Sequence, residues 1–176
     1  MEKHDAISAL KSRKSIRKFT GDPVSEEQIQ EILNAAITAP SAGNKQPWRI
    51  VIIRDKEQIH RLAEAAYGQA VVANSNVVFG VCAVPDESSE RYGERGRDLY
   101  CIQDTAALTY AILLSIHFMG LGGCWVGAFD DDKISKVLNL PTNMKPVSLV
   151  PVGIPASDPS SRPRRELGEI TVKDSF

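Results

Sequence analysis

Two arginines and a serine alternate near the N-terminus, in the stretch SRKSIRKF at residues 12–19. If this stretch is extended, every second side chain points the same way. Arg13, Ser15 and Arg17 would then aim their hydrogen-bond donors at one spot, and Ile16 would turn to the opposite side. Such a group could bind a phosphate or a polarised heterocycle. The alternative is that a helix ends here and that its cations complement the negative end of the helix dipole.

A second set of arginines lies near the C-terminus, in SRPRRE at residues 161–166. Arg162 and Arg164 are two positions apart and would share a side of an extended, proline-stiffened chain. The alternative is a solvated charge run. The whole chain has a net charge of −1, so it has no general basic field to hold a nucleic acid. Local clusters of this kind suit a small anionic ligand better than a polyanion.

Two loops could bring polar groups close to a ligand. The loop APSAGNKQPW at residues 39–48 is dense in donors such as Ser41 and Asn44, but it lacks the spacing of a phosphate-binding P-loop. The stretch MGLGGCWVG at residues 119–127 is no dinucleotide fingerprint, because Trp125 stands where the third glycine is required. Its glycines permit the close approach of a flat ligand, or they serve only a helix-to-strand turn.

No constellation of catalytic side chains is present. Without a Ser/His/Asp, Cys/His or paired acidic arrangement, we predict no catalytic residue, and an enzyme of this sequence would need a cofactor for the chemistry. The three histidines are far apart and predict no metal site. The three cysteines lack a C-x-x-C pair, which is typical of buried, reduced thiols. No signal-peptide core follows Met1, and the apolar stretch at 108–121 is too short to span a bilayer, so we expect a cytoplasmic protein that binds no membrane.

Helices and strands mix without regular βαβ alternation, which favours an α+β fold around a mixed, largely antiparallel sheet. Apolar periodicity and capping residues predict helices at residues 3–13, 25–39, 55–66, 98–119 and 130–140. Apolar and β-branched runs predict strands at 48–54, 76–84, 122–129 and 147–153. The charged, glycine-containing residues 85–97 predict a loop or lid.

The length of 176 residues fits a single domain, residues 1–176, without internal repeats. The tail, residues 155–176, contains three prolines, and only EITVK at residues 169–173 resembles a strand. It has too few apolar residues to bury itself on its own subunit. We therefore expect a partner subunit to supply the surface for it.

Taken together, these segments resemble the nitroreductase family of FMN-dependent oxidoreductases. The resemblance covers nearly the whole chain in the family's order: SRKSIRKF, ITAPSAGNKQPWRIVII, IQDTAALTYAILLSIHFMGLGGCWVGAFDDDKI, PVSLVPVGIP and then an arginine pair. The chain is similar to the compact members. The resemblance implies a three-layer α/β/α sandwich. It also implies a homodimer with two FMN sites at the interface, in which the tail wraps the partner and contributes to the phosphate site.

The resemblance also implies roles for single residues. Arg13, Ser15 and Arg17 would face FMN, with Arg13 nearest the phosphate and Arg17 nearer N1 and O2 of the flavin. Arg162 and Arg164 would bind the phosphate. A loop would reach the flavin that is bound mainly by the other subunit; its implied contact residues are Pro40, Ser41, Ala42 and Asn44. The backbone of a second stretch would lie along the isoalloxazine near N5; its residues are Trp125, Val126 and Gly127.

One departure from the family pattern concerns the charge near the flavin. Many larger relatives place a second cation near O2. Here the corresponding stretch is YGQAVVANS, with Gln69 as an amide contact and Ala70 where a lysine is expected. A positive charge near N1 stabilises the reduced flavin and favours two-electron transfer, so one cation fewer alters the reduction potential and the reaction with oxygen.

The activity implied by the resemblance is the transfer of a hydride from NADH or NADPH to FMN, and of electrons from there to a nitroaromatic, quinone or similar acceptor in ping-pong order. Tyr92 and the arginines of residues 85–97 would shape the acceptor pocket. Three alternatives remain. One is other flavin chemistry on this fold, such as dehalogenation, enone reduction or azoline oxidation. The others are a flavin-binding protein with little turnover and a structural dimer module.

Overall fold

The computed structural model describes residues 3–176, with side chains described from residue 7 onward; Met1 and Glu2 of the expected 1–176 domain lie outside it. Within these residues, four strands form one sheet in the order β1-β2-β4-β3. The strands are β1 (Trp48–Ile53), β2 (Val77–Ala83), β3 (Gly122–Gly123) and β4 (Lys145–Gly153). Each pairing between the described strands is antiparallel, so the parallel component that the sequence allowed is not seen in the single chain.

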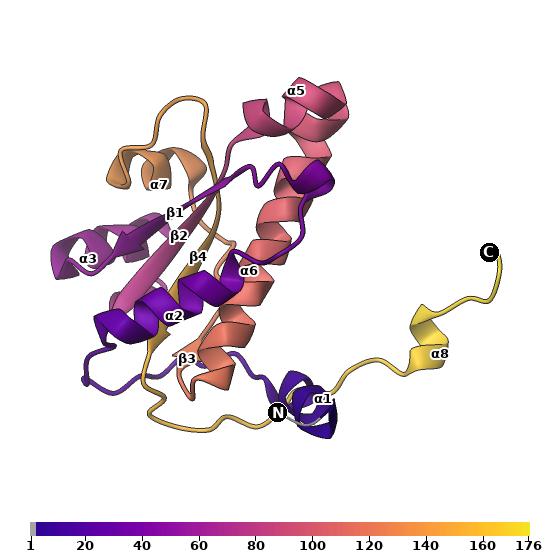
Figure 1. The fold of residues 1–176 in the computed structure, drawn as a ribbon. Helices are drawn as coiled ribbons and strands as arrows, with labels where there is room; N and C mark the ends of the chain where they lie inside the picture. Colours follow the sequence, from indigo (N-terminus) through magenta and orange to yellow (C-terminus); the bar gives the residue numbers. More distant parts are fainter. Residues whose placement is uncertain (1–2) are drawn as a thin grey trace.

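Helices cover both faces of the sheet, which gives the three layers of Figure 1. In chain order the helical elements are α1 (Lys3–Ser12), α2 (Glu26–Ala36), the 3₁₀ turn η1 (Ala42–Asn44), α3 (Lys56–Ala65), α4 (Ala70–Ala73), α5 (Pro85–Arg95), the π-helical turn η2 (Gly96–Tyr100), α6 (Cys101–Phe118), α7 (Asp131–Val137) and α8 (Leu167–Ile170). The α+β class and the three layers predicted from the sequence are confirmed.

The two cores follow from the alternation of side chains in β2. Phe79 and Val81 point to the face covered by α2 and α6, where they pack with Ile112. Val78 and Cys82 point to the opposite face, which α3, α4 and α7 cover. Because every residue of β2 is buried, this strand reads as a continuous apolar run rather than an alternating one.

α6 is apolar on more than one side. Leu108, Ile112 and Ile116 are buried against the sheet, whereas Tyr110 and Phe118 are each 46% exposed on the outer side. The helical run Pro85–Phe118 is long and apolar enough to cross a membrane by length and composition alone. Since the inner side of α6 forms part of the main core, its apolar composition has a structural explanation.

The helix that begins after Ser25 forms as predicted. The Ser25 hydroxyl accepts the backbone N–H of Gln28 at 3.1 Å, and the Gln28 side chain accepts the N–H of Ser25 at 3.0 Å. This capping box satisfies two of the donors that a helix N-terminus leaves free. The chain leaves the helix at Ala36, before Pro40.

The prediction of a loop at residues 85–97 is wrong, because this segment is α5 and the start of η2. Pro85 at the first turn and the carboxylates of Asp86 and Glu87 favour a helix N-terminus there. Gly93 breaks the helical geometry with φ +57°, which only glycine adopts without strain. The glycine therefore marks a kink within a helix rather than a loop.

The predicted strand at residues 122–129 is shorter than expected. Ladder pairing covers Gly122–Gly123, and an isolated bridge joins Val126 to Leu149. The expected strand at residues 169–173 is also wrong for the single chain, where α8 occupies Leu167–Ile170. A strand needs a neighbour to pair with, and the tail extends away from the body of the molecule (Figure 1).

All three cysteines are buried and free. Cys82 lies within β2, and burial raises the pKa of its thiol to about 11. Cys101 begins α6, and Cys124 follows β3. Among the described residues, no group of His, Cys, Asp and Glu side chains could hold a metal ion.

Candidate functional site

The segment after α1 is extended and is held against the edge of the sheet by backbone hydrogen bonds. The N–H of Ile16 donates to the carbonyl of Gly123 at 3.0 Å, and that of Thr20 donates to Ile154 at 2.8 Å. The N–H of Ala156 donates back to Lys18 at 3.0 Å. The helix ends at Ser12, so the extended interpretation of the stretch is confirmed.

Ile16 turns inward, as predicted. It is 9% exposed, and a Cβ added to Gly122 would lie only 2.7 Å from its side chain. The absence of a side chain at Gly122 therefore lets the segment lie directly on β3. This close packing determines which way the alternate side chains of the segment point.

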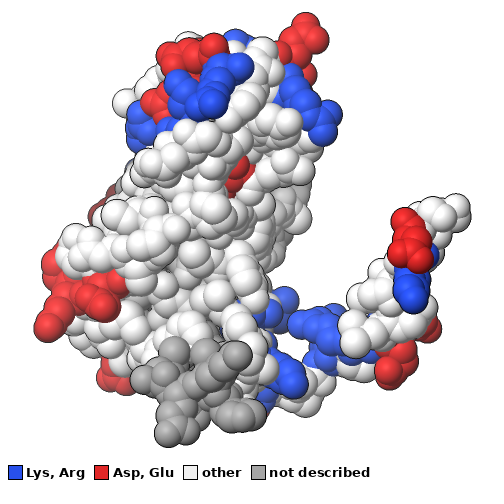
Figure 2. All heavy atoms as spheres, turned by 45° about the vertical axis from the view of Figure 1, so that its right-hand side comes forward, with Lys and Arg blue, Asp and Glu red and all other residues white. Residues whose placement is uncertain are grey.

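A cleft of about 630 Å³ opens beside the segment, between the body and the tail. It is lined by Lys11, Arg13, Lys14, Ser15, Arg17, Pro159, Ser160, Ser161, Arg162 and Arg164. The structure thus brings together five of the residues singled out in the sequence, from both ends of the chain. None of the ten lining residues is acidic, and Figure 2 shows Lys and Arg side chains gathered where the tail leaves the body.

Most cations of this cleft are available to a ligand. Lys14 is neutralised by Asp158, with its Nζ 2.8 Å from a carboxylate oxygen, and this ion pair ties the N-terminal segment to the tail. Within the described residues, Arg13, Arg162 and Arg164 form no ion pair. Guanidinium groups without a carboxylate partner bind phosphate in a bidentate manner, so the cleft is a candidate phosphate site.

The loop at residues 40–44 lies at the other end of the molecule. The N–H of Ala42 donates to Asp104 near the start of α6, whereas Ser12, beside the cleft, lies 3.0 Å from His117 near the end of α6. Asp104 and His117 are separated by about 20 Å at the 1.5 Å rise per residue of a helix. A single chain therefore does not bring Pro40, Ser41, Ala42 and Asn44 to the arginine cleft.

The loop has an unusual backbone. Gly43, Asn44 and Gln46 have φ values of +57°, +56° and +51°, and the latter two residues pay a steric cost for this left-handed conformation. The Ser41 hydroxyl stabilises the turn by accepting the N–H of Gln46 at 2.9 Å. Such strain at a loop is typical of a functional site.

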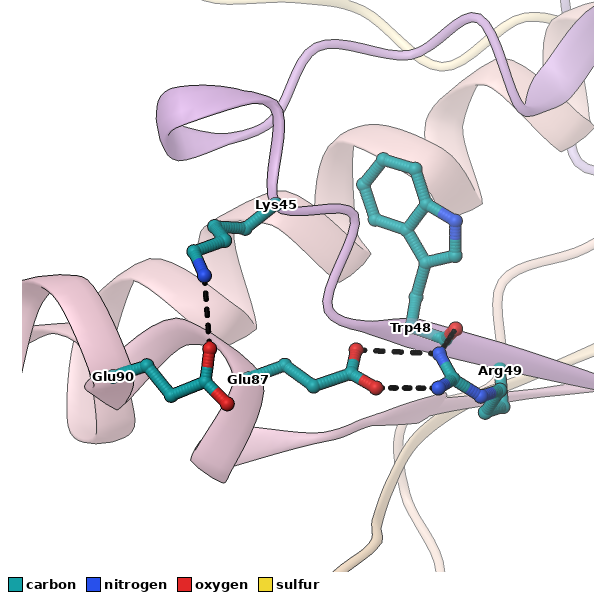
Figure 3. A network of polar contacts seen from close by, with 5 residues as sticks. All are labelled: Lys45, Trp48, Arg49, Glu87 and Glu90. Carbon is teal, nitrogen blue, oxygen red and sulfur yellow. Dashed lines mark hydrogen bonds and ion pairs between the residues drawn. The ribbon is translucent and has the colours of Figure 1, made fainter.

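Ion pairs connect this loop and β1 to α5, as Figure 3 shows. The Nζ of Lys45 lies 2.9 Å from Glu90, and Arg49 forms a two-pronged pair with Glu87. Tyr92 covers the loop directly, because a Cβ on Gly43 would lie 2.5 Å from its hydroxyl oxygen. α5 therefore closes over the loop as a helical lid.

The stretch Trp125 to Gly127 continues along the outer edge of the sheet, just past the point where Ile16 is bonded. Val126 exchanges two backbone hydrogen bonds with Leu149, each 2.9 Å long. Val126 is buried, whereas Trp125 and the backbone of Gly127 are exposed. A planar ligand can therefore reach this edge.

Gln69 has a structural contact that sequence reasoning missed. Its Nε2 donates to the carbonyl of Ala66 at 3.0 Å and to that of Ala128 at 2.8 Å. One amide hydrogen thus bonds to the end of α3 and the other holds Ala128, so only the carbonyl oxygen of Gln69 is left for a ligand.

Asp104 is a further residue that the sequence did not reveal. It is 7% exposed, its Oδ1 accepts the N–H of Ala42 at 3.0 Å, and its Oδ2 is buried without a partner among the described residues. Burial raises the pKa of the Asp104 carboxyl, against the opposing effect of the Ala42 N–H. Its signal in the sequence is that it is the single acid in the largely apolar stretch that forms α6.

Comparison with known proteins agrees with this fold and site. A profile of the Nitroreductase family matches residues 10–78 and 69–154. An NADH dehydrogenase of Thermus thermophilus is 34% identical over 187 residues, which cover 90% of this chain and 91% of that protein. An oxygen-insensitive NADPH nitroreductase of Salmonella typhimurium is 29% identical, over 90% of this chain and 69% of that protein.

A solved structure of nitroreductase A from Vibrio parahaemolyticus is also similar. It is 26% identical, with a TM-score of 0.90, over 100% of this chain and 77% of that chain. With most of the sequence matched by the family profile, the chain belongs to the nitroreductase family. The enzyme is an NAD(P)H-dependent oxidoreductase.

The contact between Gly122 and Ile16 yields the first prediction. Gly122→Ala places a methyl group 2.7 Å from the Ile16 side chain, so we expect a loss of about 1–3 kcal/mol of unfolding free energy from overpacking. Thermal or denaturant unfolding measures it. Gly21→Ala is the control, since nothing lies within 4 Å of its Cβ, and equal stability of the two variants would contradict the prediction.

Proposed function

We propose that this protein binds FMN and uses NADH or NADPH to reduce a nitroaromatic, quinone or similar small acceptor. The observation that carries the proposal is the cleft in which arginines from both ends of the chain converge and whose lining contains no acidic residue. The family membership supports the cofactor and the donor.

The donor set of the cleft fits the phosphate of FMN. Arg13, Arg162 and Arg164 supply planar pairs of N–H donors, which match phosphate oxygens. The hydroxyls of Ser15 and Ser160 add neutral donors. At the exposed edge formed by residues 125–127, a flat ring system can lie against the backbone without meeting a side chain at Gly127.

FMN bound in this cleft would supply the redox chemistry of the proposed ping-pong hydride transfer from NADH or NADPH to the acceptor. The protein contributes position and electrostatics. Arg17 would place a positive charge beside the pyrimidine side of the flavin, and Tyr92 on α5 would limit the size of the acceptor and exclude water. Because Ala70 supplies no second cation, Arg17 would carry this electrostatic role alone.

We infer that two identical chains complete the site. The loop at residues 40–44 lies about 20 Å along α6 from the cleft of its own chain, so a partner must bring it there. Apolar side chains that a dimer would bury are exposed: Tyr110 and Phe118 on α6, and Leu167 and Ile170 on the tail. Because α6 is apolar on its outer side as well as its inner side, a partner that covers the outer side is expected.

We also place the protein in the cytoplasm. The three cysteines are free, and reducing conditions keep thiols in that state. No disulfide contributes to the fold within the described residues.

The first test is the visible spectrum of the purified protein. We expect flavin bands that titration with NADH or NADPH bleaches in the absence of oxygen and that a nitroaromatic or quinone restores. Extraction should release FMN rather than FAD or riboflavin. A colourless protein that ignores added FMN would refute the proposal. Flavin bands that no nucleotide bleaches would favour the alternative of a flavin-binding protein with little turnover.

The arginine cleft makes a sharper prediction. Arg13→Ala and Arg164→Ala should each weaken FMN binding at least about tenfold, the loss expected for a charge-assisted phosphate contact. Riboflavin binding should change little, because riboflavin lacks the phosphate. Fluorescence quenching measures both dissociation constants. Arg165→Ala is the matched control, since Arg165 does not line the cleft. If FMN and riboflavin were affected equally, the phosphate assignment would be wrong.

The tail makes a prediction about assembly. Removal of residues 167–176 deletes exposed apolar side chains but leaves Arg162 and Arg164 in place. We expect the dimer dissociation constant to rise at least about tenfold, since each apolar side chain buried contributes about 1.5–3 kcal/mol. Analytical ultracentrifugation measures the change, with Lys173→Ala as control. An unchanged dimer would show that the tail has no part in assembly.

A further inference from the structure

We propose that Asp104 is a positioning residue for the flavin site. By accepting the backbone N–H of Ala42, it would hold the loop at residues 41–46 in the shape that reaches the flavin of the partner subunit. This inference rests on the proposed function, in which that loop contacts FMN. Asp104 itself does not touch the cofactor and acts through the loop.

The contact lies at the point where the loop changes direction. Ala42 begins η1, and the left-handed residues Gly43, Asn44 and Gln46 follow within four positions. A backbone in this conformation persists only where its surroundings hold it. The Asp104 carboxylate anchors the loop to the core helix α6, whereas the bond from Gln46 to Ser41 lies within the loop itself.

The anchor is rigid because Asp104 is set into the core. It is 7% exposed, and the next residue, Thr105, is completely buried. The hydroxyl of Thr105 donates to the carbonyl of Cys101 at 2.8 Å, within the same turn of helix. Since the Asp104 side chain is buried and hydrogen-bonded to Ala42, it couples the position of α6 to that of the loop.

The position of Asp104 costs stability, which indicates a role other than folding. Its Oδ2 is buried without a partner, and no cation among the described residues pairs with it. Burial raises the pKa of Asp104, so the ionised form of this carboxyl is disfavoured in the folded protein. This penalty disappears as the pH falls through the raised pKa towards the unfolded value of about 4. A residue needed only for packing would be better replaced by an apolar one.

Two substitutions separate positioning from folding. Asp104→Ala removes the acceptor of the Ala42 N–H, whereas Asp104→Asn keeps an oxygen acceptor of the same shape and removes the charge. Thr109→Val is the matched control: Thr109 lies on the same helix as Asp104 but away from the loop, and the change breaks its buried hydrogen bond of 2.9 Å to Ser148 on β4. All three are made in the full-length protein.

The readouts are the FMN dissociation constant by fluorescence quenching, amide hydrogen exchange across residues 41–46 in the flavin-free protein, and the melting temperature. We expect Asp104→Ala to weaken FMN binding at least about tenfold, the equivalent of one hydrogen bond to a charged group, and to speed exchange in the loop. Asp104→Asn should bind FMN within about threefold of the wild type, because its amide oxygen still accepts. Thr109→Val should lower the melting temperature without changing FMN affinity.

Four outcomes would overturn the inference. Asp104→Ala with wild-type FMN affinity would remove the positioning role and leave the proposed function intact. If Asp104→Asn folds but binds FMN as weakly as Asp104→Ala, the acceptor oxygen of residue 104 does not determine FMN affinity. The measurement on Asp104→Asn remains decisive if Asp104→Ala does not fold. A loss of affinity in Thr109→Val equal to that in Asp104→Ala would indicate general destabilisation. A wild type that binds no FMN would overturn the proposed function itself.

Discussion

Three backbone hydrogen bonds decide where both ends of this polypeptide lie. Ile16 is bonded to β3, and Thr20 and Lys18 are bonded to the chain that leaves β4. These bonds need an edge strand that carries no side chain at Gly122, because the segment lies in direct contact with it. Because alternate side chains of an extended segment point the same way, Arg13, Ser15 and Arg17 all face the cleft. The proline-rich tail begins beside these three residues.

The division of the site follows from the same arrangement. One chain presents cations at one end of α6 and a strained loop at the other end. A helix of 18 residues is too long for a single small ligand to bridge both groups. The proposed dimer resolves this separation, since an antiparallel arrangement of two long helices brings the start of one beside the end of the other. The apolar outer side of α6 is consistent with that arrangement.

Much of the fold could be predicted from the sequence. The extended segment, the capping box at Ser25 and the strands β1, β2 and β4 follow from local periodicity and local hydrogen bonds, which a sequence displays directly. The convergence of Arg13 with Arg164 could not come from periodicity, since it depends on long-range pairing. It was predicted only through the resemblance of ordered motifs to a family. The residue-level contacts with FMN stay predictions.

The errors also have physical reasons. Charges and glycines at residues 85–97 indicated a loop, but Gly93 is a kink within a helical run and the charges form ion pairs with Lys45 and Arg49. Asp104 carries no motif, because its role depends on a backbone N–H far away in the sequence. Gln69 looked like a ligand contact, yet its amide hydrogens are taken by two carbonyls. A contact between a side chain and a backbone group far away in the sequence produces no periodic pattern of residue types, so it could not be predicted from the sequence.

The buried cysteines have a consequence for a protein that handles electrons. Only a thiolate attacks peroxides or exchanges with disulfides, and at a pKa of about 11 almost no Cys82 is ionised near neutral pH. Cys101 and Cys124 are likewise shielded from solvent. The polypeptide can therefore surround a reactive cofactor while its three thiols stay unreactive, and oxidative damage would begin elsewhere, at a half-buried thioether such as Met119 or Met144.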